Sequence, residues 1–377
     1  MKKLTVGIPA YKAQDHISDC LSSIQVQTIK DEISVIIASD NPEDDYEFTK
    51  ERYPDLDITI LDCDENTGAG LARQRALDAC ETDWITFIDA DDVFFTPFAL
   101  EQLYKGTNNP VIIEVQGAFL QEIENKLDST NNNMQMFNNM GMRGVPRNDV
   151  GHPWVFGRLY NRKFLKDNDI EFSELRAMED GEFNWKIRMT IEGSPFQIAI
   201  IEEPVYLWRV GSEHSITRSN QDENGIPQYN FDLCQTGATI ASIRASKFCR
   251  KKNPFNGGID RFIAEMMVDK YFTYVECCDK KPIFADQNLF NAKRFYHECF
   301  EEIEGKIEKK ILSDIYTMQR AQHGGDLLGI IPEISFFEFM EKIKTDEYGG
   351  EEELKEIRSH YPAEIIESDI KTGVAIF

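Results

Sequence analysis

The sequence predicts an α/β protein: a Rossmann-like, mainly parallel sheet flanked by helices, followed by a mostly α-helical domain. Two observations lead to this prediction. Short apolar segments alternate with segments of helical periodicity in the N-terminal part of the chain. From about Tyr229 onward, apolar residues recur at spacings of three and four, as on one face of a helix. We therefore expect an α/β domain over residues 1–220 and a helical domain over residues 221–377.

The alternation can be followed along the chain. Strands are expected at Leu4–Ile8, Ile33–Ala38, Asp57–Leu61, Trp84–Ile88, Ile198–Ile201 and Val205–Arg209, and helices at Asp15–Gln27, Leu71–Cys80 and from Met178 to Ile191. No GxGxxG motif follows the first strand, which argues against a dinucleotide-binding fold. The Asn- and Met-rich segment Asn125–Asn148 has no clear period. We expect it to be a long loop that acts as a mobile lid.

Composition excludes several classes of protein. The formal net charge of −25 disfavours broad adhesion to nucleic acid or anionic lipid. No apolar run approaches the roughly 20 residues that span a bilayer, and the N-terminus lacks the pattern of a signal peptide. The eight cysteines show no CxxC spacing. We expect reduced thiols in a cytoplasmic protein.

The most informative stretch is Trp84–Phe94. Its apolar beginning predicts a buried strand, and it runs directly into Asp89, Asp91 and Asp92. In extended chain, Asp89 and Asp91 would point the same way, and like charges so close repel unless a cation lies beside them. Mg²⁺ or Mn²⁺ is the natural partner of such oxygen ligands. The alternative is a solvated turn after a strand.

An ordered set of motifs resembles glycosyltransferase family 2, the inverting GT-A transferases that use nucleotide-diphospho sugars. The matching segments are Val6–Tyr11, Gln25–Thr28, Asp40, Asn66–Gly68 leading to Arg73, Asp89–Asp92 and Glu179-Asp180. The resemblance covers about the first 220 residues. The helical domain resembles no family that we can name.

The resemblance implies a nucleotide pocket. Pro9 and Tyr11 would line it, with Tyr11 packing on the base, and Asp40 would accept the N3–H of uracil. Asn66 and Arg73 would reach the base or the diphosphate. Alternatives remain: Tyr11 as a core aromatic, Asp40 as a helix cap, and Arg73 in a surface salt bridge. The family often has a second Asp after the first, where this chain has Asn41.

The resemblance also implies a metal site and a base. Asp91 would ligate Mn²⁺ or Mg²⁺, Asp89 would contact the ribose, and His214 would add a ligand or touch the diphosphate. His214 could equally be structural. Asp180 would deprotonate the acceptor hydroxyl. Glu179 is its competitor, and Asp180 could instead be an N-cap.

These expectations favour a metal-dependent inverting glycosyltransferase that moves a sugar from a UDP-sugar to a hydroxyl of a surface glycan or polymer. A phage-type enzyme that modifies a hydroxylated nucleobase in DNA is an alternative, although the basic residues Lys247 and Arg250–Lys252 are more simply a solvated helix end. A non-catalytic nucleotide-sugar-binding module would need no base, and a nucleotidyltransferase would want a basic phosphate loop. The helical domain could support a homo-oligomer.

Overall fold

The computed structural model describes residues 2–123, 126–128, 154–210, 228–327, 334–345 and 349–361. The chain divides into two compact units. The first, here called the sheet unit, comprises Met1–Leu175 and Ser194–Glu213, and the second, the helical unit, comprises Arg176–Gly193 and His214–Phe377. This division differs from the expected boundary at residue 220, because the helix that begins at Glu179 belongs with the helical unit. His214 and residues 129–153 lie outside the described residues.

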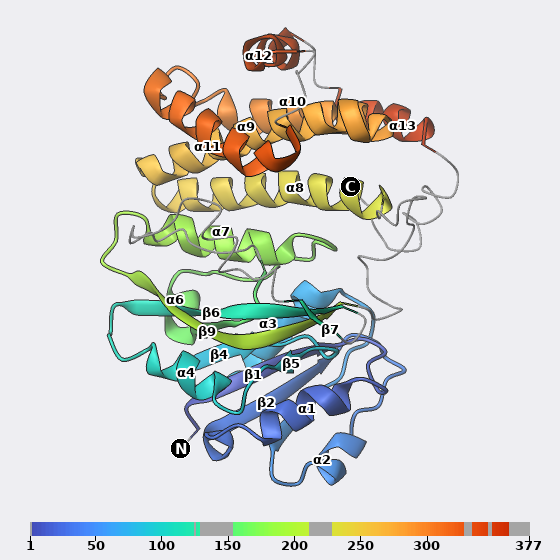
Figure 1. The fold of residues 1–377 in the computed structure, drawn as a ribbon, viewed down its shortest axis with the longest axis vertical. Coiled ribbons are helices and arrows are strands. Elements are labelled where there is room, and N and C mark those ends of the chain that lie inside the picture. Colours follow the sequence, from blue (N-terminus) through green and yellow to red (C-terminus); the bar gives the residue numbers. More distant parts are fainter. Residues whose placement is uncertain are drawn as a thin grey trace. The chain divides into compact units, whose positions relative to one another are not determined.

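The sheet unit begins with the predicted strand–helix alternation (Figure 1). Its elements are β1 (Leu4–Ala10), α1 (Ile17–Gln25), β2 (Ile33–Ser39), α2 (Phe48–Arg52), β3 (Asp57–Leu61), α3 (Ala69–Ala79) and β4 (Trp84–Phe87). The four strands are parallel in the order β3-β2-β1-β4. Strand β1 lies between β2 and β4, so the order in which successive strands are added to the sheet reverses at β1.

The other half of the sheet is mixed. It contains β5 (Val93–Phe94), β6 (Ile112–Ile123), β7 (Lys126–Asp128), β8 (Arg158–Asn161) and β9 (Gln197–Val210), with the short helices α4 (Ala99–Lys105) and α6 (Arg162–Asp167). Strand β8 is antiparallel to β4 and β6, whereas β6 and β9 are parallel. The sheet is therefore entirely parallel only in its N-terminal half.

Three details differ from the expected elements. The two short strands expected between Ile198 and Arg209 are one strand, β9, whose register against β6 shifts near Pro204. Strands β5, β6 and β8 were not predicted. Strand β7 occupies the start of the expected loop 125–148, because Lys126–Asp128 pair with Gln121–Ile123 in a hairpin.

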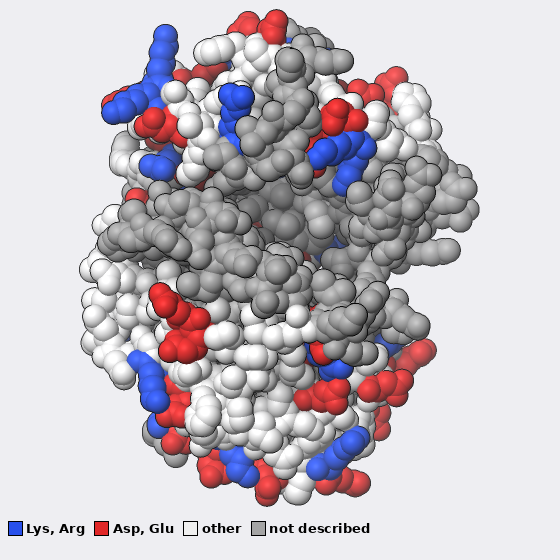
Figure 2. Space-filling model, viewed as in Figure 1, with Lys and Arg blue, Asp and Glu red and all other residues white. Residues whose placement is uncertain are grey.

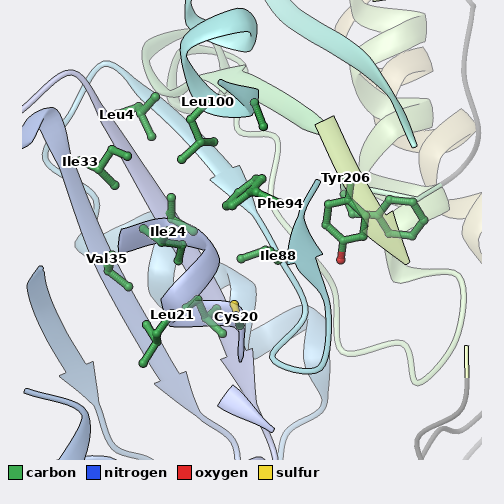
Figure 3. Packing of buried hydrophobic residues seen from close by; sticks show 14 of the residues in the cluster. Leu4, Cys20, Leu21, Ile24, Ile33, Val35, Ile88, Phe94, Leu100 and Tyr206 are labelled. Carbon is green, nitrogen blue, oxygen red and sulfur yellow. The ribbon is translucent and has the colours of Figure 1, made fainter. Parts of the chain in front are cut away.

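One core cluster organises the sheet unit. The apolar face of α1, with Cys20, Leu21 and Ile24, packs on the sheet among residues of β1, β2 and β5 (Figure 3). On the opposite side, α3 approaches β1 closely. A Cβ added to Gly7 would lie 3.0 Å from the Phe87 ring and 3.2 Å from Ala76 of α3. Gly7 thus permits the tight contact between helix and strand.

The helical unit has a core of its own, formed mainly by α8, α9, α10 and α12. Its helices are α7 (Glu179–Ile191), α8 (Gln228–Lys252), α9 (Gly257–Lys280), α10 (Ala285–Phe295), α11 (Lys309–Leu327), α12 (Phe336–Thr345) and α13 (Gly350–Ser359). Within this unit, α7 packs along α8, and α9 packs on α10 and α11. Among the described residues, no helix combines the length and apolar character needed to cross a membrane. All eight cysteines are free thiols, as expected.

Candidate nucleotide-sugar site

The candidate site lies at one edge of the sheet unit, where three adjacent parallel strands end. Ala10 at the end of β1 pairs with Ser39 at the end of β2, and Gly7 pairs with Phe87 at the end of β4. The Asp40 N–H donates to the carbonyl of Ala10 at 2.7 Å. Open α/β sheets bind ligands at such an edge, beside the strand where the order reverses. The structure therefore brings the segments that follow β1, β2 and β4 together.

Tyr11 projects from this edge. Pro9 is half-buried within β1, and the Tyr11 side chain that follows is 48% exposed. The alternative that Tyr11 is a core aromatic is therefore wrong. The ammonium group of Lys12 lies 5.2 Å from the centre of the Tyr11 ring. An exposed aromatic ring at a strand end can stack on a planar ligand.

The backbone at Lys12 is unusual, and a residue that the sequence did not single out holds it in place. Lys12 has φ 49°, in the left-handed region that few non-glycine residues adopt. Its N–H donates to Oδ2 of Asp44 at 2.6 Å. Asp44 also accepts hydrogen bonds from Gln14, Tyr46 and Asn41. Partial burial alone would raise the pKa of the Asp44 carboxyl, but these four donors outweigh it and hold the pKa below its ordinary value. The only sequence signal for Asp44 was its place in the turn after β2.

Asp40 is buried and anchors the turn before α3. Its carboxylate accepts hydrogen bonds from the N–H and hydroxyl of Thr67, both at 2.9 Å, and from the N–H of Gly68 at 2.8 Å. Asn66 donates to its carbonyl oxygen at 3.0 Å. Gly68 has φ 91°, which suits glycine. The alternative that Asp40 caps the next helix is therefore wrong, because its carboxylate holds the turn before α3 and makes no contact with the first turn of α2, a helix that lies wholly within the described residues. Contact with uracil stays a prediction.

Arg73 is buried, not at the surface. Its side chain is 4% exposed, and its guanidinium donates to Oδ1 of Asp89 at 2.8 Å. The surface salt-bridge alternative is therefore wrong. Hydrogen bonds in which both partners are charged are among the stronger ones. Arg73 of α3 thus fixes the first carboxylate after β4.

Asp89–Asp92 form a turn. The Asp92 N–H donates to the Asp89 carbonyl at 3.0 Å, which closes it. The premise that Asp89 and Asp91 lie in extended chain is therefore wrong, because β4 already ends at Phe87. The alternative of a turn after the strand is correct for the backbone. Asp89 and Asp91 are nonetheless both partly exposed at the edge.

Asp92 is the carboxylate of the motif to which the sequence assigned no role. It is 2% exposed. Its Oδ2 accepts the hydroxyl hydrogen of Tyr206 at 2.5 Å, and its Oδ1 accepts the N–H of Arg209 at 2.7 Å. Burial, together with the charges of Asp89 and Asp91, raises the pKa of Asp92 well above its ordinary value, while the two hydrogen bonds oppose that shift. Tyr206 is separated from Asp92 by 114 positions, so no local pattern could reveal the pair.

The donor set suits a hard divalent cation bound together with a phosphate. Within the described part of the chain, no three His, Cys, Asp or Glu residues are grouped as metal ligands. Mg²⁺ and Mn²⁺ bound with nucleotides commonly use one or two carboxylates and complete their shell with phosphate oxygens and water. Asp89 and Asp91 provide such carboxylates at the edge. The role of His214 stays a prediction.

The expected base belongs to the other unit. Asp180 is the second residue of α7 and is partly buried. The N-cap of this helix is Met178, with φ 66° in the left-handed region, so the alternative that Asp180 is the N-cap is wrong. Acidic residues in the first turn are favourable beside the helix dipole. Glu179 and Asp180 both occupy this turn, so the choice between them stays a prediction.

Part of the sequence is similar to known glycosyltransferases. Residues 5–168 match the family described as Glycosyl transferase family 2. The poly(ribitol-phosphate) beta-N-acetylglucosaminyltransferase TarS of Staphylococcus aureus is 24% identical over 226 residues, 56% of this chain and 36% of TarS. Glycosyltransferase GlyA of Streptococcus pneumoniae is 24% identical over 221 residues, 55% of this chain and 30% of GlyA.

A solved structure shows the same fold. The crystal structure of S. aureus TarS in complex with UDP-GlcNAc has a TM-score of 0.61 and 16% identity, over 85% of this chain and 88% of that chain. Residues 5–168 thus match the model of this family, and the chain has the GT-A fold. The chain spans less than two thirds of the length of the curated relatives that it matches.

Proposed function

We propose that the chain is a metal-dependent, inverting glycosyltransferase that transfers a sugar from a UDP-sugar to a hydroxyl acceptor. One observation supports this most strongly. The ends of β1, β2 and β4 gather an exposed aromatic ring, a buried carboxylate and a turn of carboxylates at one edge, within a family 2 segment. These are the group types that a nucleoside diphosphate needs: a stacking surface, hydrogen-bonding groups and partners for a cation.

In this proposal the sheet unit binds the donor. Tyr11 stacks on the uracil, with Pro9 beside it. Asp40 and Asn66 form hydrogen bonds with the polar edge of the base. Asp89 meets the ribose. Arg73 holds Asp89 and adds positive charge near the diphosphate. Pro9 and Arg73 lie on elements of the sheet unit, and Tyr11 and Asp40 directly follow strands, so most of the pocket is built on a rigid scaffold.

Asp91 is the proposed protein ligand of Mn²⁺ or Mg²⁺, with Asp89 beside it and His214 as a further candidate. When bound, the cation would offset the charge that gathers on the departing diphosphate. The residues of the chain orient that diphosphate and keep the donor at the sheet edge. The turn that carries Asp91 needs fixed neighbours, because three carboxylates within four residues repel one another.

Asp180 is the proposed base. The acceptor oxygen attacks the anomeric carbon while the bond from that carbon to the diphosphate oxygen breaks, and the acceptor proton passes to the Asp180 carboxylate. A single displacement of this kind inverts the anomeric centre. A non-catalytic sugar-binding module would need no such base.

We propose a glycan or polyol polymer as the acceptor. Several relatives are named for teichoic acid or poly(ribitol-phosphate) chemistry. On the described surface of the face in Figure 2, Lys and Arg lie among Asp and Glu and form no broad basic area. In the cluster that could favour DNA, Lys247 pairs with Glu298 and Arg250 pairs with Asp260. These pairs weaken the case for a DNA acceptor.

A donor screen tests the proposal. The full chain is incubated with UDP-, GDP- and dTDP-sugars in Mn²⁺ or in EDTA, and nucleoside diphosphate release is measured. We expect release from UDP-sugars only, and only with the cation. Poly(ribitol phosphate), a neutral oligosaccharide and hydroxymethylated DNA are then added as acceptors. Tight UDP-sugar binding without release under any condition would support the binding module instead.

A further inference from the structure

We infer that Tyr206 is a positioning residue that holds the Asp89–Asp92 turn in the form that binds the cation and the donor diphosphate. This inference rests on the proposed function. It concerns a residue of β9, far from the motif along the chain, whose hydroxyl reaches the two ends of the turn at once.

The contacts define this role. The Tyr206 hydroxyl oxygen accepts the N–H of Asp89 at 3.3 Å, and its hydrogen is donated to Oδ2 of Asp92 at 2.5 Å. The turn itself is closed by the bond from the Asp92 N–H to the Asp89 carbonyl. Three residues after Tyr206, the N–H of Arg209 donates to the other oxygen of Asp92. One strand thus secures both ends of the turn.

The hydroxyl is not needed for the packing of β9. The Tyr206 ring stacks on Phe156 with 4.5 Å between centroids, and β9 pairs with β5 through Phe94 and Val93. The Phe95 N–H also donates to the carbonyl of Val205 at 2.9 Å. A phenylalanine at position 206 would keep all of these contacts. Removing the hydroxyl group therefore tests the contact with the turn and leaves the packing of β9 unchanged.

The position of the turn depends on the contacts made by the residues at its two ends. Arg73 holds Asp89 from the α3 side, while Tyr206 and Arg209 hold Asp92 from the β9 side. Asp91 stands between these two fixed neighbours. If the hydroxyl is lost, Oδ2 of the buried Asp92 loses its hydrogen-bond donor, and the turn is expected to shift so that this oxygen finds another. A shift of this kind moves the proposed ligand Asp91.

The test compares two buried tyrosines of the sheet unit. Tyr206→Phe removes the contact with the turn, whereas the control Tyr53→Phe removes a hydroxyl that donates to the carbonyl of Ser18. Calorimetry measures Mn²⁺ binding to each full chain at saturating UDP, and UDP binding in EDTA. We expect Tyr206→Phe to weaken Mn²⁺ binding by about 10- to 100-fold, the usual effect of losing a partner that orients a ligand. UDP binding in EDTA should stay unchanged in both variants, and Tyr53→Phe should bind Mn²⁺ like the wild type.

The outcomes separate this inference from the proposed function. If the wild type binds no Mn²⁺ with UDP, the proposed function itself fails. If the wild type binds Mn²⁺ and Tyr206→Phe binds it equally well, only the positioning role is overturned. Loss of UDP binding in EDTA by Tyr206→Phe would also overturn it, because the damage would then be general. Should Tyr206→Phe not fold, Asp92→Asn enters the same assay with the same expected weakening, and unchanged Mn²⁺ binding overturns the role.

Discussion

The sheet unit and the helical unit carry their acidic residues in different ways. In the sheet unit, the turn Asp89–Asp92 is held by side chains or backbone from α3 and β9, and Glu114 is buried against Arg158 of another strand. In the helical unit, Glu179 and Asp180 open a helix that follows a left-handed Met178. Some ion pairs there lie within one helix, such as Glu182–Lys186, and others join two helices, such as Arg188–Glu265.

This difference suggests a division of labour. Groups tied across several elements cannot move independently, which suits the recognition of a donor with many polar contacts. A carboxylate in the first turn of a helix is placed by that helix, which suits a group with one task, such as accepting a proton.

The largest effect is expected in the sheet unit. Asp91→Asn should lower turnover by about 10³-fold or more, because an amide is a poor ligand for a hard cation and several kcal/mol of charge stabilisation would be lost. Donor turnover with Mn²⁺ measures it, and EDTA should reproduce the loss in the wild type. Asp78→Asn, on the exposed side of α3, is the matched control and should stay active. Full wild-type activity in EDTA would show that Asp91 has no metal to hold.

The base of the helical unit comes next. Asp180→Asn should lower turnover by about 10²- to 10⁴-fold, the usual contribution of a positioned general base. UDP binding, measured by calorimetry, should survive because the proposed donor contacts belong to the sheet unit. Glu179→Gln is the matched comparison. If that variant is inactive and Asp180→Asn is nearly normal, Glu179 is the base. If both stay active, the direct displacement proposed above is wrong.

The variant Asp40→Ala tests whether this buried carboxylate, which holds the turn before α3, also contacts the uracil base. Asp40→Ala should weaken UDP binding by about 1.5–3 kcal/mol, the size of a hydrogen bond to a charged group. Calorimetry with UDP and with N3-methyl-UDP separates two causes. A loss for UDP alone indicates contact with the N3–H of uracil. An equal loss for both ligands would mean that Asp40 acts only by holding Thr67 and Gly68.

The smallest effect concerns stability of the helical unit. Lys270 is 1% exposed, and its ammonium nitrogen has no hydrogen-bond partner among the described residues. Burial lowers its pKa below the ordinary 10.5, despite the nearby charge of Asp269. Lys270→Met should therefore raise the unfolding free energy by about 1 kcal/mol near neutral pH, because a buried polar group without a partner is costly. The exposed Lys251→Met is the control, with denaturant unfolding as the measurement.

The sign of the pH dependence follows from the same pKa. The unfolded chain binds the Lys270 proton more tightly than the folded chain, so wild-type stability should rise with pH as the folded form loses this proton, and level off above about 10.5. The advantage of Lys270→Met should shrink over that range. An advantage that stays constant with pH would mean that the pKa of Lys270 is the same in the folded and the unfolded chain, and that burial does not lower it.

Most of the first half of the sheet unit could be predicted from the sequence. Apolar runs and helical spacings located β1, β2, β3, β4, α1 and α3 to within a few residues. Strand β6 escaped because its pattern contains Glu114 and Gln116, which are buried although polar. Glu114 can be buried because it pairs with Arg158, a residue 44 positions later. A pattern of hydrophobicity cannot anticipate an ion pair between strands.

The candidate site, like the sheet, could be predicted from the sequence only in part. The sequence by itself determined which groups end the strands, because an apolar run followed by carboxylates is a pattern of chain neighbours. Only the tertiary structure decided what those groups contact: Arg73 for Asp89, Tyr206 for Asp92, and Asp44 for the backbone of Lys12. It also decided that Asp180 belongs with the helical unit. The physical reason is that hydrogen bonds and ion pairs join residues that meet only when the sheet has formed, and Tyr206 meets Asp92 across 114 positions.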